Sequence, residues 1–174
     1  MGVSIEAIKE LRHATSASVA HCRKALVETK GDVTKAATWL RKKGLEIAKS
    51  KQGRASKEGR VEAYVHQGNK IGVLLEVNCE TDFAAKNSEF AQFSRDVAMH
   101  IAACDPEYLK KEDVPEKILK EEKNKEEFCK SNCLLEQVFI KDPSITINDY
   151  LGSLIAKIGE NILIRRFIRY KIGE

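Results

Sequence analysis

With 174 residues, 43% of them apolar and 32% charged, the chain has enough material for one medium-sized domain or two small ones. No apolar run approaches the roughly 20 residues that cross a bilayer as a helix, so no membrane-spanning helix is expected. The first residues carry neither the basic head nor the apolar block of a secretory signal, and we expect a cytoplasmic protein.

The cysteines do not follow a metal-binding pattern. Cys129 and Cys133 lie one helical turn apart, without a second pair or a nearby histidine to complete a zinc site. We interpret all the cysteines as reduced thiols that mostly fill small spaces in the core, and we expect no metal and no cofactor. A disulfide between two subunits is the one exception that the sequence leaves open. The cysteines are Cys22, Cys79, Cys104, Cys129 and Cys133.

The net charge of +4 is unevenly distributed along the chain. Residues 1–60 carry 14 Lys and Arg against 6 Asp and Glu, whereas residues 61–174 carry 16 against 20. A basic front half suits an approach to RNA or to an acidic protein surface. Trp39 is the only aromatic residue in this half, so it lacks the stacking platform of a single-strand RNA binder.

The front of the chain repeats a helical pattern three times. Ser4 is placed to cap a first helix, Ser16 or Ser18 a second, and Asp32 a third. The residues expected to face inward are Ile5, Ile8 and Leu11, then Val19, Cys22 and Leu26, then Val33, Ala36, Ala37 and Leu40. Residues 1–48 therefore predict a small three-helix bundle with the layout of ubiquitin-associated domains, which usually serves a partner.

A basic segment separates this bundle from the rest of the chain. Gly44 is expected to end the third helix, and residues 49–60 are predicted to form a mobile linker. A solvated tether is preferred here to an RNA-binding arm. The remaining part, residues 61–174, begins with two alternating segments, 61–65 and 71–78, which predict an antiparallel hairpin.

Two helices are predicted beyond the hairpin. The first is capped near Asn87 or Ser88 and stops at Asp105, and the second begins after Thr146 and ends at Gly159. The apolar stripe of the first helix is Phe90, Phe93, Val97 and Ile101.

The stretch between these helices is polar for most of its length. Residues 107–131 are dense in Lys and Glu and predict an exposed, protruding helix without a wide apolar face. A loop follows at residues 134–143, and Phe139 and Ile140 are expected to be exposed on it.

A third strand completes the predicted fold. Residues 162–168 alternate in character, which places Ile164 and Ile168 on the same face. The chain is therefore predicted to be α+β: a three-helix bundle, a basic linker, and a three-stranded antiparallel sheet with helices on one side. Three strands are close to the minimum for independent stability, so one sheet face is expected to meet a second copy.

Thr81, Asp82 and Phe83 lie on the connection between the second strand and the helix that follows. An exposed Phe beside a carboxylate suits insertion into another protein, with the ring as an anchor and the acid as a polar latch. The local pattern by itself favours a second interpretation. In that interpretation Phe83 is the first core residue of the helix, and Asp82 is a local cap.

Four motifs occur in order along almost the whole chain. They are Cys22-Arg-Lys-Ala-Leu, Trp39-Leu-Arg-Lys-Lys-Gly, Glu76-Val-Asn-Cys-Glu-Thr-Asp-Phe-Ala-Ala-Lys and Ile155-Ala-Lys-Ile-Gly-Glu-Asn-Ile-Leu-Ile-Arg-Arg. Together they resemble the translation elongation factor Ts family, in its short form with a single core subdomain. One departure is Thr15-Ser-Ala-Ser, where the family usually has Thr-Gly-Ala-Gly, which should change the turn into the second helix.

The resemblance implies a guanine-nucleotide exchange factor that binds elongation factor Tu and promotes GDP release during translation elongation. It implies that Thr81, Asp82 and Phe83 engage the partner's GTPase domain near the nucleotide pocket. Phe83 would wedge between two partner helices and Asp82 would bond nearby groups, which disturbs the partner's magnesium and phosphate contacts. This reverses the preference for a buried Phe83. The short form also implies a homodimer, because a second copy supplies the missing half.

Further partner contacts are implied by position. Arg23 corresponds to a basic residue on the partner surface of the bundle, and Ile71 and Gly72 lie on an edge of the core that similar proteins press on the partner. His100 falls at a family contact point, although its surroundings alone predict an ordinary histidine on the helix surface. Ile140 lies in the loop that resembles the segment touching the partner's other domains.

Two other functions stay open from the residues alone. One is a protein-binding adaptor built on the front bundle, and the other is an RNA-binding translation factor that uses residues 1–60. An enzyme is not expected, because no P-loop, metal set, Cys-His pair or Ser-His-Asp grouping is singled out by its spacing. We expect neither a membrane nor a nucleic acid as a direct partner.

Overall fold

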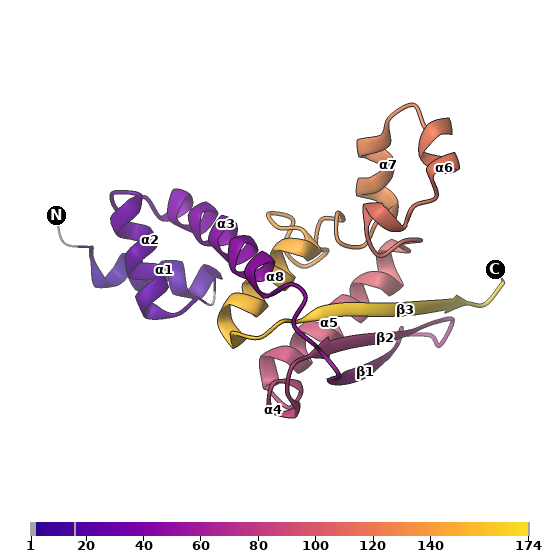
Figure 1. The fold of residues 1–174 in the computed structure, drawn as a ribbon, viewed down its shortest axis with the longest axis horizontal. Helices are drawn as coiled ribbons and strands as arrows, with labels where there is room; N and C mark the ends of the chain where they lie inside the picture. Colours follow the sequence, from indigo (N-terminus) through magenta and orange to yellow (C-terminus); the bar gives the residue numbers. More distant parts are fainter. Residues whose placement is uncertain (1–2, 16, 174) are drawn as a thin grey trace.

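The computed structural model describes residues 3–15 and 17–173 and has an α+β architecture (Figure 1). Helices α1 to α3 form a bundle at the N-terminal end, and the rest of the chain is built on a three-stranded sheet. The α+β class predicted from the sequence is confirmed. Within the described ranges, no helix has the length and apolar character needed to cross a bilayer.

The bundle begins each of its helices at a side-chain cap. Its elements are α1 (Ile5–Thr15), α2 (Val19–Glu28) and α3 (Val33–Lys51). Oxygens of Ser4, Ser18 and Asp32 accept backbone N–H bonds from the first turns at 3.0, 3.2 and 2.9 Å. These caps satisfy amides that a helix start leaves unpaired, as predicted. Ser16, the alternative cap of the second helix, lies outside the described residues.

The bundle has a small apolar core of its own. Its buried members are Leu11, Cys22, Ala25, Leu26 and Ala36. Ile5 and Val19 were expected inside but are exposed. Each is the first residue of its helix.

Helix α3 is longer than predicted and joins the bundle to the rest of the molecule. It runs through Gly44, which was expected to end it, and continues to Lys51. Gly44 is buried against α8 (Ile147–Ile158), where a Cβ atom on it would lie 3.2 Å from the backbone oxygen of Gly152. Glycine is therefore used here for close helix packing and not for a cap. Only residues 52–57 connect α3 to the first strand.

The sheet is antiparallel with β2 in the centre. Its strands are β1 (Glu58–Val65), β2 (Ile71–Cys79) and β3 (Leu163–Lys171), in the order β1-β2-β3. The predicted hairpin is present, with Val65 opposite Gly72 at its closed end.

A register irregularity in β3 overturns one expectation from the sequence. Glu76 pairs with Arg166, whereas its neighbour Val77 pairs with Ile164, so the register shifts between them. An extra residue in one strand reverses the faces of the residues that follow it. Ile164 is consequently buried and Ile168 is exposed, although strict alternation placed them on one face.

One face of the sheet is covered by helices. The covering elements are α4 (Asp82–Ala85) and α5 (Ser88–Cys104), and α8 packs in turn on α5 and α3. The predicted stripe of α5 faces the sheet, and its four apolar residues are fully buried. Thr146 caps α8 through a reciprocal capping box with Asp149.

The Lys- and Glu-rich segment forms a separate protrusion (Figure 1). Its elements are a short 3-10 turn η1 (Lys111–Asp113) and the helices α6 (Glu116–Glu121) and α7 (Lys125–Asn132). The single exposed helix that was predicted is thus two helices around a small cluster of Val114, Cys129 and Cys133. Burial raises the pKa of the Cys133 thiol to about 12, so this side chain acts as an apolar filler.

The close contact of α3 with α8 predicts sensitivity to added volume at Gly44. Gly44→Val should lower the free energy of unfolding by about 1–3 kcal/mol, because the branched side chain would have to displace backbone atoms of α8. Urea denaturation followed by circular dichroism measures this change. Lys42→Val is the control, since it places the same side chain on the exposed surface of the same helix. Equal stabilities of the two variants would contradict the prediction.

Candidate functional site

Thr81, Asp82 and Phe83 form a short, capped turn directly after β2. Thr81 is the N-cap of α4, and its hydroxyl oxygen accepts a hydrogen bond from the backbone N–H of Ala84 at 3.3 Å. The Cys79 thiol at the end of β2 donates to the Thr81 carbonyl oxygen at 3.1 Å. The turn is therefore fixed to the end of the central strand, so it presents its side chains from a rigid support.

Phe83 points away from the core. It is 81% exposed, the most exposed of the large apolar residues in the described part of the chain. The expectation of a buried Phe83 from the local pattern is wrong. Its neighbour Ala84 is buried and provides the inward contact of this turn.

Asp82 lies beside the ring without capping the helix. Its carboxylate accepts a hydrogen bond from Lys86 Nζ at 2.7 Å, one helical turn away. This bond and the positive charge of Lys86 lower the pKa of Asp82, so the group is an anion at neutral pH. Thr81 has the capping role that the local interpretation gave to Asp82. The turn thus presents an aromatic ring next to a carboxylate.

A polar junction that sequence reasoning missed supports the N-terminal side of this turn. The carboxylate of Glu160 accepts hydrogen bonds from the backbone N–H groups of Glu80 and Thr81 at 3.1 and 3.0 Å. It also accepts the Thr81 hydroxyl at 2.6 Å. In return, Glu80 Oε1 accepts the backbone N–H of Asn161 at 2.6 Å. The polar pair Glu160-Asn161, directly before the apolar third strand, is the only sequence signal that marks this junction.

His100 lies in the interior of the protein. It is fully buried on α5, so the expectation of a surface histidine is wrong. Its Nδ1 atom accepts the backbone N–H of Ile140 at 3.3 Å, which requires the proton to be on Nε2. Nε2 then donates to Gln137 Oε1 at 2.9 Å. His100 therefore supports the loop that carries Ile140, and its ring does not face solvent.

A second anchor holds the same loop. The buried carboxylate of Asp96 accepts hydrogen bonds from Lys141 Nζ at 2.5 Å and from the Tyr150 hydroxyl at 3.1 Å. Phe139, which was expected to be exposed, is buried because its ring stacks on Tyr150 at 5.1 Å between centroids. Ile140 is 48% exposed, so it remains available for contact.

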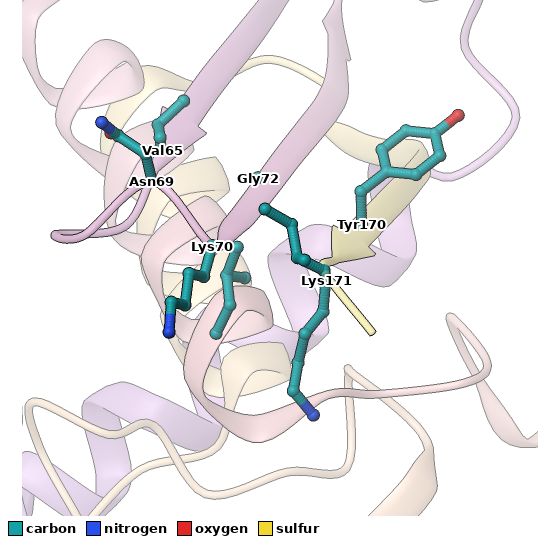
Figure 2. Close-up of a pocket in the computed structure, with 8 residues that line it drawn as sticks. Val65, Asn69, Lys70, Gly72, Tyr170 and Lys171 are labelled. Carbon is teal, nitrogen blue, oxygen red and sulfur yellow. The ribbon is translucent and has the colours of Figure 1, made fainter. Parts of the chain in front are cut away.

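Ile71 and Gly72 lie at the opposite end of β2 from Phe83. They line a shallow hollow at the closed end of the hairpin, together with residues of β3 such as Tyr170 (Figure 2). Lys70 and Lys171 are also among the residues that line this hollow (Figure 2).

The structure does not gather the predicted contact residues at one point. Arg23 is exposed on α2 in the bundle, Phe83 lies at one end of the sheet, and Ile71 lies at the other end. Ile140 lies on a loop supported by the C-terminal half of α5. Any single partner that touches all of them must be large. Among the described residues, no three His, Cys, Asp or Glu side chains form a group that could hold a metal ion.

The helical front, the sheet covered on one face and the exposed aromatic turn define an α+β protein that carries a rigid aromatic projection. A family model described as Elongation factor TS matches residues 4–127. The chain belongs to the elongation factor Ts family.

Curated relatives match over nearly their full lengths. An Elongation factor Ts of Caldanaerobacter subterraneus subsp. tengcongensis is 47% identical over 99% of this chain and 98% of its own. The Elongation factor Ts of Carboxydothermus hydrogenoformans is 48% identical over 99% of this chain and 90% of its own. That of Geotalea daltonii is 48% identical over the whole chain and 91% of its own.

The buried position of His100 predicts a pH dependence of stability. Burial lowers its pKa in the folded state, whereas an unfolded histidine titrates near 6.5. The unfolded chain therefore binds this proton more readily, so the contribution to stability is complete above about pH 6.5 and declines as the pH falls below it. His100→Gln should flatten this part of the pH dependence, measured by urea denaturation at pH 7.5 and pH 5.

A matched variant separates this effect from general acid sensitivity. His13→Gln makes the same change at an exposed position on α1 and should leave the loss of stability between the two pH values as it is in the unmodified chain. If His100→Gln and the unmodified chain lose equal stability on acidification, the buried histidine is not the source of the dependence.

Proposed function

We propose that the chain is a guanine-nucleotide exchange factor for elongation factor Tu. In this proposal the chain binds elongation factor Tu in its GDP form and promotes GDP release during translation elongation. The observation that carries the proposal is Phe83, exposed beside the carboxylate of Asp82 on a capped turn. The names of the relatives support the same function. Such a factor works through protein contact and breaks no covalent bond. The proposal includes a cytoplasmic location, as expected for a translation factor.

The exchange mechanism follows from differential binding. GDP is held through phosphate contacts with backbone amides and through a magnesium ion. A factor that prefers the nucleotide-free partner must lower GDP affinity by its own difference in affinity for the two states, and this coupling is reciprocal. A hundredfold weakening of GDP binding requires about 2.7 kcal/mol. Burial of a Phe side chain supplies about 1.5–3 kcal/mol, so Phe83 and its polar neighbour are sufficient in scale.

We assign Phe83 as the wedge, and Thr81 and Asp82 as its support and polar contact. Arg23 would add an electrostatic contact from the bundle, and Ile140 an apolar contact from the anchored loop. His100 would act only through that loop, because it is buried. Ile71 and Gly72, at the far end of β2, complete the proposed set of site residues: Arg23, Ile71, Gly72, Thr81, Asp82, Phe83, His100 and Ile140.

We further propose that the chain forms a homodimer through the open face of its sheet. This face lies opposite α5, and exposed apolar residues from all three strands stand next to each other in register. The pair Glu76–Arg166, at 2.7 Å, lies on the same face. An apolar surface of this kind on a three-stranded sheet supports a second sheet as its cover. The exposed apolar residues are Val61, Val65, Leu74, Ile168 and Tyr170.

Replacement of Phe83 tests the exchange function. Phe83→Ala should slow the saturating rate of GDP release from elongation factor Tu by about tenfold to a hundredfold, because the anchor ring is lost. Its urea midpoint should not change, since the ring is exposed. Stopped-flow release of a fluorescent GDP, with and without the chain, measures the rate.

Two further variants make this result specific. Ile5→Ala truncates another exposed apolar residue, on α1, and should leave the release rate unaltered. Arg23→Ala should weaken binding while the rate at saturation stays near normal. A normal rate in a well-folded Phe83→Ala would rule out the wedge, and no acceleration by the unmodified chain would favour the adaptor or RNA-binding function.

A charge on the open sheet face tests the homodimer. Leu74→Glu should weaken dimerisation by at least about a hundredfold, because the interface would enclose an unpaired carboxylate from each subunit. Size-exclusion chromatography with light scattering over a range of concentrations measures the assembly. Val27→Glu, on the exposed surface of α2, is the control and should remain dimeric. A monomeric unmodified chain at every concentration would reject this part of the proposal.

A further inference from the structure

We propose that Glu160 is a positioning residue that sets the direction of the Phe83 ring. The inference rests on the proposed exchange function, because it names the residue that prepares the wedge for its partner. Glu160 lies far from Phe83 in sequence, in the connection between α8 and β3. Its hydrogen bonds go to the backbone of Glu80 and Thr81, just before Phe83, so we infer that it acts on the ring through this backbone.

The Phe83 turn is too small to hold its own geometry. Helix α4 has only four residues, little more than one turn, and isolated helical turns of this length are unstable in water. Phe83 itself is 81% exposed, so packing of the ring contributes little to its direction. Besides the inward packing of Ala84, the direction of the ring therefore depends on the way the backbone enters the turn.

Glu160 holds that entry point at three positions. One carboxylate oxygen accepts the backbone N–H groups of Glu80 and Thr81, and the other accepts the Thr81 hydroxyl. Because the Thr81 hydroxyl donates its hydrogen bond to Glu160, the lone pairs of its oxygen remain free to accept the N–H of Ala84. The capping bond and the anchor are thus parts of one network, in which hydrogen bonds to a carboxylate are the stronger kind.

The anchor is itself held in place on its other side. The residue before it, Gly159, ends α8 with φ at 84°, a left-handed conformation that turns the chain out of the helix. The residue after it, Asn161, is buried and donates its side-chain amide to the Arg54 carbonyl oxygen at 2.9 Å. Its backbone N–H donates to Glu80. Glu160 therefore has little freedom to move away from the turn.

Two substitutions at Glu160 separate positioning from charge. Glu160→Ala removes all three acceptor contacts and should lower the saturating rate of GDP release from elongation factor Tu by at least about tenfold, the equivalent of one lost charge-assisted hydrogen bond. Glu160→Gln keeps one oxygen for the two backbone N–H groups, and its NH₂ group can donate to the Thr81 hydroxyl. It should restore most of the rate. An equal defect in both variants would overturn the proposal.

A double-variant cycle tests whether Glu160 works through the ring. In a Phe83→Ala background, Glu160→Ala should cause no further loss of rate, because the group that it orients is absent. Losses that add in the double variant would overturn the inference. Glu89→Gln is the control, since Glu89 is a carboxylate whose ion-pair partner is Lys157 of α8, and this change should leave the rate unchanged.

Hydrogen exchange tests the anchor without any partner. The backbone amides of Glu80 and Thr81 should lose protection in Glu160→Ala and keep it in Glu160→Gln, as followed by NMR. Unchanged protection in Glu160→Ala would overturn the positioning role even if the chain accelerates GDP release. Conversely, an unmodified chain that fails to accelerate release would reject the proposed function, while the amide measurement still decides the anchor.

Discussion

Burial of one face of a three-stranded sheet beneath α5 governs the arrangement of the whole molecule. The apolar stripe of α5 lies on β1 and β2, and α8 packs against that helix and shares its core cluster. Since the sheet has too few strands to enclose a core by itself, α5 and α8 supply the second layer. Their ends then determine where the connections emerge. The turn with Phe83 leaves from the end of β2, and the loop with Ile140 lies across α5.

Local patterns were sufficient for most of the secondary structure. The caps at Ser18, Asp32 and Thr146 and the stripe of α5 were predicted because they depend on residues within a few positions of one another. Gly44 was misread because the same residue type ends helices and permits close packing, and only the position of α8 decides between them. The faces of β3 were misread at the register shift, which no alternation pattern reveals.

The site shows the same division between local and distant information. Thr81, Asp82 and Phe83 could be selected from the sequence because an acid and an aromatic stand together after a strand. Their support could not, because Glu160 reaches them from about eighty positions away. His100 was predicted to lie on the helix surface but is buried beside apolar residues of α5. Its hydrogen-bond partner is the buried side chain of Gln137, which lies far away in the sequence. Side chains that meet only through the fold have no periodic signature.

The contact of Gly44 with Gly152 has a consequence for how tightly an extended partner is held. Two binding surfaces on a flexible tether behave as separate weak ligands whose second encounter depends on an effective concentration. Here α3 lies directly against α8, and Arg41 donates to the Ser144 carbonyl oxygen across the two parts at 2.9 Å. The two surfaces therefore lose their relative orientational freedom when the chain folds, so this cost does not fall on association. Any partner that contacts the bundle therefore finds the aromatic turn at a fixed distance and orientation.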